Sequence, residues 1–461
     1  MLKIVKYNIT NRELIYFNLN HLIIFSMVLL VFSFLGNTSN SSDMLISAIL
    51  VLITCQLFLF FSDFYDKKEY VKSSINFIST GVALMISLFV LKTVHIFLVK
   101  NFNIKIDHLL IAMSASLLAV ILSRYLLDII IEKTNLVKKI VIVGAKEEGL
   151  KLAEKIFENR KKGFKIVGFV DDDPELLGRT VSGQKVIGIM SDLEKISKEK
   201  NVDYIIVTTN KRGKNTFCSQ TLLNLKLKGY KILEYQKFYE ILLGKIDTTN
   251  LRPSWFIFSD GFKISFFKQT MKRVASIILS VLGIIITAPI MLITAILIKM
   301  DSKGPVFFKQ ARVGKNGKIF ILIKFRTMGI DAEKESGPVW AQDADPRITR
   351  IGRILRNFRI DELPQLFNVL KGEMSIVGPR PERPFFVEKL KKQINYYGQR
   401  LTVEPGITGW AAIKYGYGSS VEDTIQKLKY DLFYIKNFSV LFDFFIILLT
   451  MKVVIFGRGA K

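Results

Sequence analysis

The chain has 461 residues, half of them apolar, and its mean hydropathy of +0.31 is high for a water-soluble protein. Lys and Arg outnumber Asp and Glu by 66 to 40, a net charge of +26 that suits nucleic acid, an anionic membrane face or a phosphorylated substrate. The apolar content favours the last two. Only two cysteines occur, which excludes a disulfide framework or a thiolate metal site. No His or Cys occurs in residues 251–461, so a Ser-His or Cys-His nucleophile is excluded there.

Four apolar stretches come first, each close to the roughly 20 residues that a helix needs to cross a bilayer. They cover residues 14–35, 44–61, 75–99 and 108–131. Basic residues flank the first and last stretches and lie between the second and third, whereas residues 36–43 carry none. We therefore predict a four-helix transmembrane domain at 1–135 with both ends in the cytoplasm. No small-residue cleavage site follows the first stretch, so we do not expect a cleaved signal peptide.

Residues 136–250 alternate between short apolar runs and helical segments. The runs at 140–143, 165–170, 204–207 and 230–233 predict strands of a parallel sheet, so we expect a small Rossmann-like α/β domain. Its first turn keeps Gly144 and Gly149 but lacks the G-x-G-x-x-G spacing. Two interpretations stay open, a fold without a dinucleotide and a fold with a regulatory nucleotide. No candidate catalytic residue is visible there.

The fifth apolar run, residues 274–298, has basic residues on both flanks. A simple crossing would put one basic flank on the wrong side of the membrane, and Pro289 near the middle bends the helix. We predict a re-entrant membrane hairpin at about 272–299; the alternative is an ordinary crossing with the C-terminal part outside. The last apolar run, 438–456, carries Asp443 and Lys452, which suits a helix lying in the membrane interface.

Residues 359–381 read R-I-D-E-L-P-Q-L-F-N-V-L-K-G-E-M-S-I-V-G-P-R-P, with an acidic pair at one end and an Arg between two prolines at the other. Asp361 is an acceptable N-cap, Pro364 falls in the first turn, and Gly372 ends the predicted helix. A carboxylate stays ionised at the positive end of a helix, which also attracts phosphate.

The pair Asp361 and Glu362 has three interpretations. Two adjacent carboxylates can bind Mg²⁺, or one can attack phosphorus while the other holds the metal. In the structural alternative, Asp361 only caps a helix and the nearby arginines are solvated or paired with acids. The basic motifs around the pair favour phosphate chemistry. They are K-F-R-T-M at 324–328, D-P-R-I-T-R-I-G-R at 345–353 and G-P-R-P at 378–381.

These motifs, in this order and followed by P-G-I-T-G-W at 405–410, resemble those of the polyprenyl-phosphate hexose-1-phosphate transferases. These are the monotopic phosphoglycosyl transferases that begin bacterial glycan assembly. The resemblance covers residues 268–457 closely and the rest by layout, as in the long members of the family. It implies a membrane α and α/β fold with a mostly helical catalytic domain at 251–461. It also implies a multi-pass protein of the bacterial inner membrane, with the α/β and catalytic domains on the cytoplasmic face.

The resemblance further implies a two-step displacement. Asp361 would attack the sugar-proximal phosphorus of a UDP-sugar and release UMP, and a polyprenyl phosphate would then attack the aspartyl intermediate. Glu362 would help to place Mg²⁺, and four cationic side chains would neutralise phosphate oxygens: Arg326, Arg356, Arg380 and Lys324. The implied partners are UDP-sugar, polyprenyl phosphate, the lipid bilayer, downstream glycan-assembly enzymes and a second copy in a homo-oligomer, without nucleic acid.

The sequence departs from the family pattern downstream. Glu404 stands where many relatives carry a basic residue, and K-Y-G-Y-G at 414–418 replaces N-G-R, which leaves the sugar open. Lys414 either takes over a phosphate contact or belongs to a Gly-rich turn. Asp431 matches a recurring acid of the family and is either an additional acid of the site or a structural residue.

Other functions were weighed against this one. Asp343 and Asp345 form a D-x-D pattern typical of metal-dependent glycosyltransferases, but Asp345 also begins the D-P-R-I-T-R motif. A nucleotide-sugar dehydratase would need an intact dinucleotide turn. The non-enzymatic alternative is a membrane-tethered scaffold or nucleotide sensor built on the α/β domain, in which the Asp-Glu pair would be inert.

Overall fold

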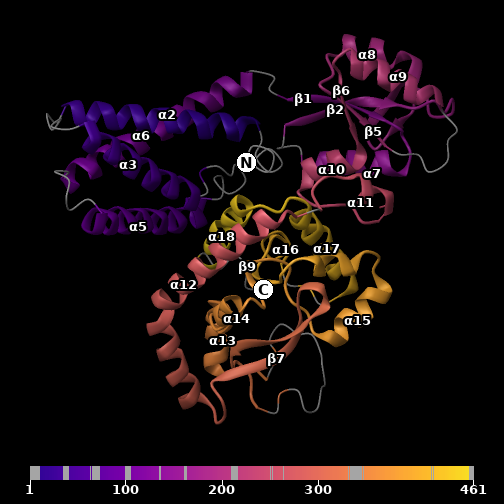
Figure 1. Ribbon diagram of the computed structural model, residues 1–461. Coiled ribbons are helices and arrows are strands. Elements are labelled where there is room, and N and C mark those ends of the chain that lie inside the picture. Colours follow the sequence, from indigo (N-terminus) through magenta and orange to yellow (C-terminus); the bar gives the residue numbers. More distant parts are fainter. Residues whose placement is uncertain are drawn as a thin grey trace. The chain divides into compact units, whose positions relative to one another are not determined.

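The structure is a computed structural model. It describes residues 11–34, 41–62, 64, 73–98, 105–133, 137–159, 163–208, 216–249, 251, 253–262, 264–330, 332, 345, 347–416, 418 and 420–455. Two compact units divide the chain, one over Asn8–Tyr235 and one that contains Gln236–Lys461. Their elements are labelled in Figure 1.

Four helices occupy the four N-terminal apolar stretches: α2 (Asn11–Phe34), α3 (Ser41–Phe61), α5 (Ser73–Leu98) and α6 (Ile106–Lys133). Small and polar side chains such as Ala48, Ser87 and Ser116 are buried between helices, whereas Leu30 and Phe89 are exposed. This is the pattern of helices that pack in lipid. Within the described residues, α6 and the later α12 are long and apolar enough to cross a membrane, and α2, α3 and α5 contain shorter apolar segments. The helices are confirmed, and four crossings stay a prediction.

The parallel α/β domain is confirmed. Its sheet has the order β3-β4-β2-β1-β5-β6, and every pairing is parallel except that of β3 with β4. The strands are β1 (Lys138–Val143), β2 (Phe164–Val170), β3 (Thr180–Val181), β4 (Gln184–Gly188), β5 (Tyr204–Val207) and β6 (Lys231–Glu234). The intervening helices are α7 (Glu147–Glu158), α8 (Leu193–Glu199) and α9 (Thr216–Leu227). Val141, Val170 and Ile205 form part of its buried core.

The second unit begins earlier than the predicted boundary at residue 250. Helix α10 (Tyr235–Leu243) is followed by Ile246, which lies in the core of the second unit with Trp410. Two buried ion pairs fix this segment: Glu240 with Lys436 at 2.7 Å and Asp247 with Lys429 at 2.9 Å. Such long-range pairs leave no local pattern in the sequence, so a boundary drawn from strand and helix periodicity misses them.

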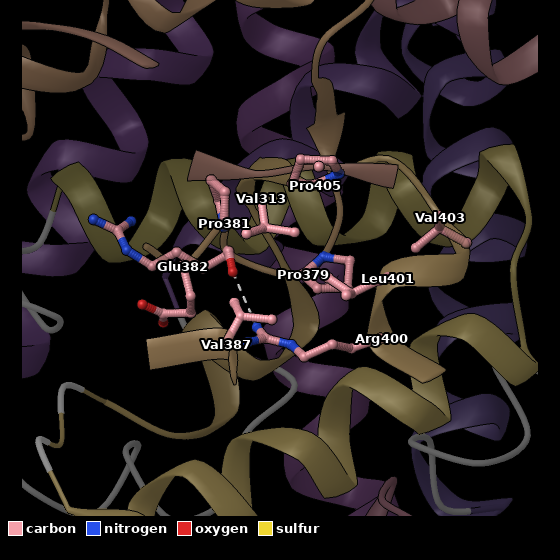
Figure 2. A pocket seen from close by; sticks show the side chains of 11 residues that line it. Val313, Pro379, Pro381, Glu382, Val387, Arg400, Leu401, Val403 and Pro405 are labelled. Atoms are coloured by element: carbon pink, nitrogen blue, oxygen red, sulfur yellow. Dashed lines mark hydrogen bonds between the residues drawn. The ribbon is translucent and has the colours of Figure 1, made fainter. Parts of the chain in front are cut away.

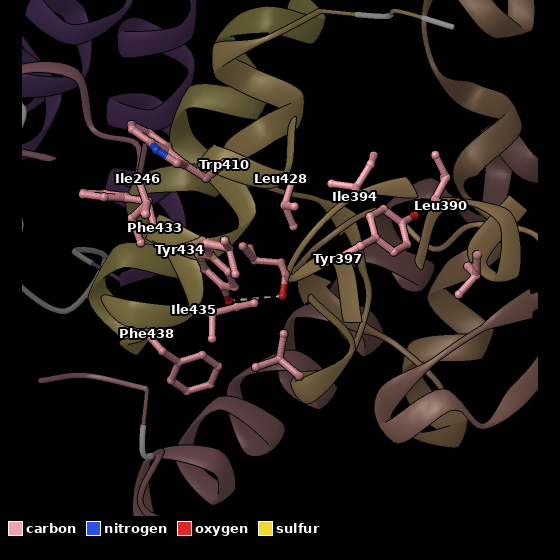
Figure 3. Packing of buried hydrophobic residues seen from close by; sticks show 14 of the residues in the cluster. Ile246, Leu390, Ile394, Tyr397, Trp410, Leu428, Phe433, Tyr434, Ile435 and Phe438 are labelled. Carbon is pink, nitrogen blue, oxygen red and sulfur yellow. Dashed lines mark hydrogen bonds between the residues drawn. The ribbon is translucent and has the colours of Figure 1, made fainter. Parts of the chain in front are cut away.

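The second unit is mostly helical and contains two pairs of strands in its described residues. Its helices are α11 (Pro253–Phe258), α12 (Phe266–Asp301), α13 (Arg350–Asn357), α14 (Gln365–Lys371), α15 (Pro384–Gln393), α16 (Trp410–Lys414), α17 (Val421–Lys436) and α18 (Val440–Ile455). Strands β7 (Phe307–Val313) and β8 (Ile319–Phe325) form an antiparallel hairpin, and β9 (Ser375–Val377) pairs in parallel with β10 (Gly406–Thr408). Figure 3 shows the core, where the Tyr434 hydroxyl oxygen lies 3.3 Å from the Val377 carbonyl oxygen.

Helix α12 is one uninterrupted helix that contains Pro289, and its ribbon changes direction along its length (Figure 1). Both of its ends pack on the second unit: Arg273 donates to the Leu370 carbonyl at 2.8 Å, and Ile298 is buried with Phe325 and Leu355. Its middle is apolar and exposed, with Ile286 72% accessible. Within residues 266–301, all of which the structure describes, the segment is one helix and not a hairpin of two helices.

The charge that suggested an interfacial position for the last helix has another role. Asp443 of α18 is buried and pairs with Lys272 of α12 at 3.0 Å, while its other carboxylate oxygen accepts from the Tyr434 hydroxyl at 2.7 Å. Asp443 is therefore satisfied inside the unit, and the interfacial position of the last helix stays a prediction.

Candidate active site

The Asp-Glu pair lies in a tight turn rather than at a helix N-cap. Arg359 adopts the left-handed conformation (φ 54°) and starts a 3₁₀ turn over Ile360–Glu362. Helix α14 begins only at Gln365, with Pro364 as its N-cap. The predicted N-cap role of Asp361 was therefore wrong, whereas the predicted end at Gly372 is confirmed by its left-handed φ of 88°.

Three cations surround Glu362. Its Oε1 lies 3.1 Å from Arg380 Nη2, 3.7 Å from Lys324 Nζ and 3.8 Å from Arg359 Nη1. Burial alone would raise the pKa of Glu362, which is 6% exposed, but the charges of these three side chains outweigh it and lower the pKa to about 2. Glu362 therefore stays ionised and holds the cations in place.

Asp361 is in a different state although it is the next residue. It is 9% exposed, and none of the side chains that the structure describes forms a hydrogen bond or ion pair with its carboxylate. Burial raises the pKa of Asp361, the negative charge of Glu362 adds to this, and Lys324, Arg380 and Arg356 oppose it. The carboxylate is thus buried, close to cations and not occupied by a direct contact.

The predicted phosphate-binding residues divide into two groups. Lys324 and Arg380 contact Glu362, and Arg356 acts electrostatically on Asp361 while its Nε donates to Thr327 Oγ1 at 2.9 Å. With Arg359, four cations then face two carboxylates. The local charge is about +2, which matches a diphosphate or two phosphates.

Arg326 and Lys414 lie elsewhere. The Arg326 guanidinium donates to the carbonyl oxygens of Ser302 and Lys303 at 2.9 and 2.5 Å, so it caps the C-terminal end of α12. The side chain of Lys414 is exposed, with its Nζ 4.8 Å from the centre of the Trp410 ring. The structure brings neither side chain into contact with the acidic pair.

Asp431 contacts the site only through a residue that the sequence analysis missed. Arg400 Nη2 lies 3.0 Å from Asp431 Oδ2 and donates to the Arg380 carbonyl at 3.0 Å (Figure 2). Burial raises the pKa of Asp431 to about 6, against the charge of Arg400. Arg359 was also missed as a site residue, although it directly precedes the I-D-E sequence. Arg400 lies outside the quoted motifs and gave no local signal.

The concave region beside Arg380 is too small for a substrate. Its volume is about 10 Å³, about the space that one water molecule needs, and its walls include Pro379, Pro381 and Arg400 (Figure 2). This region is therefore the packed support of the Pro-Arg-Pro segment.

Of the alternative D-x-D metal site, the structure describes only Asp345. Arg347 donates two hydrogen bonds to the Asp345 carboxylate, from Nε to Oδ1 at 2.8 Å and from Nη2 to Oδ2 at 2.6 Å. Asp343 lies outside the described residues. A side-chain hydrogen bond from Arg347 lowers the pKa of Asp345. In the described part of the chain, no group of three His, Cys, Asp or Glu side chains could hold a metal. Asp361 and Glu362 remain as two neighbouring carboxylates, which fits Mg²⁺ that completes its shell with phosphate oxygens and water.

Comparison with known proteins identifies two sequence families along the chain. The profile of the bacterial sugar transferase family matches residues 267–457, and that of a CoA-binding domain matches residues 60–215.

Three relatives illustrate the similarity. The UDP-N-acetylgalactosamine-undecaprenyl-phosphate N-acetylgalactosaminephosphotransferase of Aeromonas hydrophila is 47% identical over 41% of this chain and 45% of that protein. The undecaprenyl-phosphate glucose phosphotransferase of Komagataeibacter xylinus is 33% identical over 71% of this chain and 60% of that protein. The UDP-glucose:undecaprenyl-phosphate glucose-1-phosphate transferase of Caulobacter vibrioides is 41% identical over 39% of this chain and 68% of that protein. The chain spans less than two thirds of the first two.

Proposed function

Because this chain belongs to the bacterial sugar transferase family, we propose that it transfers a sugar 1-phosphate from a UDP-sugar to undecaprenyl phosphate. The relatives' names include both glucose and N-acetylgalactosamine, so the sugar is left open. The observation that carries the proposal is the asymmetry of the acidic pair. Glu362 is held by three cations, while the carboxylate of Asp361 is buried and has no direct partner among the residues that the structure describes.

In the first step, a carboxylate oxygen of Asp361 attacks the sugar-proximal phosphorus of the UDP-sugar. The bond from that phosphorus to the bridging oxygen breaks, and UMP leaves with the electron pair. In the second step, an oxygen of undecaprenyl phosphate attacks the same phosphorus and the Asp361 carboxylate leaves. Both attacking groups are anions, so neither step needs a histidine base, which agrees with the absence of His from residues 251–461.

Cations make such an attack possible, because an anionic nucleophile otherwise meets an anionic phosphate. Lys324 and Arg380 lie on Glu362 beside Asp361, and their surplus charge stabilises the charge that spreads over the phosphate oxygens. With Asp361 as the nucleophile, Glu362 would help to hold Mg²⁺, which when bound supplies further charge neutralisation at the diphosphate.

We also propose that α12 dips into the membrane and returns to the cytoplasmic face. Three features support this topology: both ends of the helix pack on one compact unit, Pro289 lies inside the helix, and its middle is apolar and exposed. An exposed apolar helix of this kind gains free energy by entering lipid. The active site would then lie at the membrane surface, where the phosphate of the lipid substrate lies.

The proposed reaction is tested with membranes that contain the full chain, Mg²⁺, undecaprenyl phosphate and a panel of UDP-sugars. The expected result is UMP release and a lipid-linked diphosphate sugar with one member of the panel. Without the lipid, mass spectrometry of a protein digest should find a sugar phosphate on the peptide that contains Asp361. UMP release without any such adduct under rapid quenching would contradict the covalent step but not the overall transfer.

The topology is tested by Lys318→Cys in a chain whose two natural cysteines are replaced by serine. Lys318 is exposed in the turn between β7 and β8. It should react with a membrane-permeant maleimide and not with an impermeant maleimide added outside intact cells. Labelling from outside would exclude the return of α12 to the cytoplasmic face.

A further inference from the structure

Four consecutive carbonyl groups hold the Pro-Arg-Pro segment. Each accepts a hydrogen bond from a different donor: Pro379 from the Gly406 amide at 3.0 Å, Arg380 from Arg400 Nη2 at 3.0 Å, Pro381 from Arg312 Nη1 at 3.0 Å and Glu382 from the Val313 amide at 2.9 Å. Two of the donors are backbone amides and two are arginine side chains. The backbone of Arg380 is thereby fixed, and its side chain is aimed at Glu362.

Arg400 is itself built into the unit. Arg400 lies in the 3₁₀ segment Tyr397–Thr402 and is 7% exposed, and its Nη1 donates to the Tyr397 hydroxyl at 2.8 Å. The compensating charge comes from Asp431 of α17, which is 2% exposed. A buried guanidinium without a counter-ion is strongly unfavourable, so Asp431 keeps Arg400 charged and in place.

We propose that Arg400 and Asp431 are positioning residues, which act on the transfer reaction by holding the Arg380 carbonyl so that the Arg380 side chain meets the diphosphate. The inference rests on the proposed function, because it assigns Arg380 to the substrate phosphates. A preorganised cation needs a support that cannot move, and a shift of about 1 Å in such a group can cost about 100-fold in rate. The geometry gives Asp431 this supporting role and not that of a second acid, because among the described residues its carboxylate contacts Arg400 and not the acidic pair.

The experiment measures kcat/KM for UMP release with full-length Asp431→Asn and Arg400→Lys, each alone and combined with Arg380→Lys. Each single variant should lose about 100-fold. When Arg380→Lys is already present, the second substitution should lower kcat/KM by less than about 3-fold, because the effects of substitutions that act through one group are not additive. The pH dependence of the remaining activity should keep the wild-type midpoint. Arg400→Lys keeps a positive charge opposite Asp431, so it carries the test if Asp431→Asn does not fold.

Asp247→Asn is the matched control. Asp247 is 1% exposed and pairs with Lys429 of the same helix α17 at 2.9 Å, but it contacts no part of the Pro-Arg-Pro segment that the structure describes. The melting temperature of Asp247→Asn should fall by about as much as that of Asp431→Asn. Its kcat/KM for UMP release should change by less than about 2-fold, both with Arg380 and with Arg380→Lys.

Three outcomes would overturn the positioning role. Asp431→Asn and the control could lose the same factor in kcat/KM, or Asp431→Asn could lose the same factor with Arg380 and with Arg380→Lys. The pH midpoint of the activity could also shift in Asp431→Asn. A wild-type chain that releases no UMP with any UDP-sugar would contradict the proposed function itself, so the two failures are distinguishable.

Discussion

Two turns of this chain lead into helices and carry acidic side chains, and they differ in what is left for a ligand. In the α/β domain, Asp171 accepts from the backbone amides of Ala145 at 2.7 Å and Asp173 at 3.1 Å, and Glu147 and Glu148 occupy the first turn of α7. Asp171 thus occupies a backbone amide of the turn between β1 and α7, a type of group that can otherwise bind phosphate. In the turn at Asp361, cations outnumber acids.

The comparison shows that net charge does not locate a phosphate site in a chain of charge +26. What matters is whether the local acids are outnumbered by cations held within a few ångströms. In the first turn Asp171 binds backbone amides, whereas the turn at Asp361 keeps a surplus of positive charge and one carboxylate that has no direct partner in the described part of the chain. The predictions below test this difference, beginning with the largest effect.

Asp361→Asn should lower UMP release by a factor on the order of 10⁴ or more, because the amide cannot attack phosphorus. The raised pKa of Asp361 means that the folded state disfavours its charge, so the variant should melt at the same or a higher temperature. Turnover and thermal melting measure both effects. Glu388→Gln, an exposed acid on α15, is the control and should keep full activity. Substantial turnover by well-folded Asp361→Asn would remove Asp361 as the nucleophile.

Arg380→Ala should lower kcat/KM by about 10²- to 10³-fold, the usual cost of losing one preorganised donor of a developing charge. Lys389→Ala removes an exposed cation from the neighbouring helix α15 and should change little. A loss no larger than that of Lys389→Ala would show that Arg380 only neutralises Glu362.

The rate of the first half-reaction should depend on pH with a sign set by Asp361. Asp361 must be deprotonated to attack, so the rate should fall as the pH drops through its pKa, which burial holds above the usual value of about 3.9. UMP release without lipid is the proper measurement, because the titration of the lipid phosphate does not enter. In Glu362→Gln the midpoint should move to lower pH, since a neighbouring negative charge is removed. An upward shift or none would contradict the electrostatic coupling of the pair.

Asp171→Ala should have the smallest effect on turnover, less than about 2-fold, although it is buried at a turn of similar appearance. Two backbone amides lose their acceptor, which costs roughly 1–3 kcal/mol in the stability of the α/β domain. Thermal melting followed by a probe in that domain should show the loss. A fall in turnover as large as that of Arg380→Ala would mean that the first turn takes part in the reaction.

The sequence predicted much of the fold, because helices and strands follow from short periodic patterns. The four N-terminal helices, the parallel strands and the helix end at Gly372 are each encoded within about 30 residues. The failures concern contacts between distant segments. The pattern of the last helix gave no sign that Asp443 pairs with Lys272, far away in the chain.

Lys324 and Arg326 show the same limit inside one motif. Two residues apart, they would share a face if the strand continued, but β8 ends at Phe325 and the chain turns. Lys324 therefore reaches Glu362, whereas Arg326 caps the end of α12. The sequence could name both as candidate phosphate ligands, and it contains no information on where each side chain points after the strand ends.

The sequence by itself determined the chemistry that is possible: a carboxylate pair among basic motifs, without imidazole or thiol, next to an apolar helix with Pro289. The tertiary structure decided which cations surround Glu362, and it left Asp361 without a direct partner among the described residues. It also placed Arg400 and Asp431 behind Arg380. The physical reason is that burial and ion pairing depend on distances between side chains far apart in the chain, and such distances are fixed only when the whole unit packs.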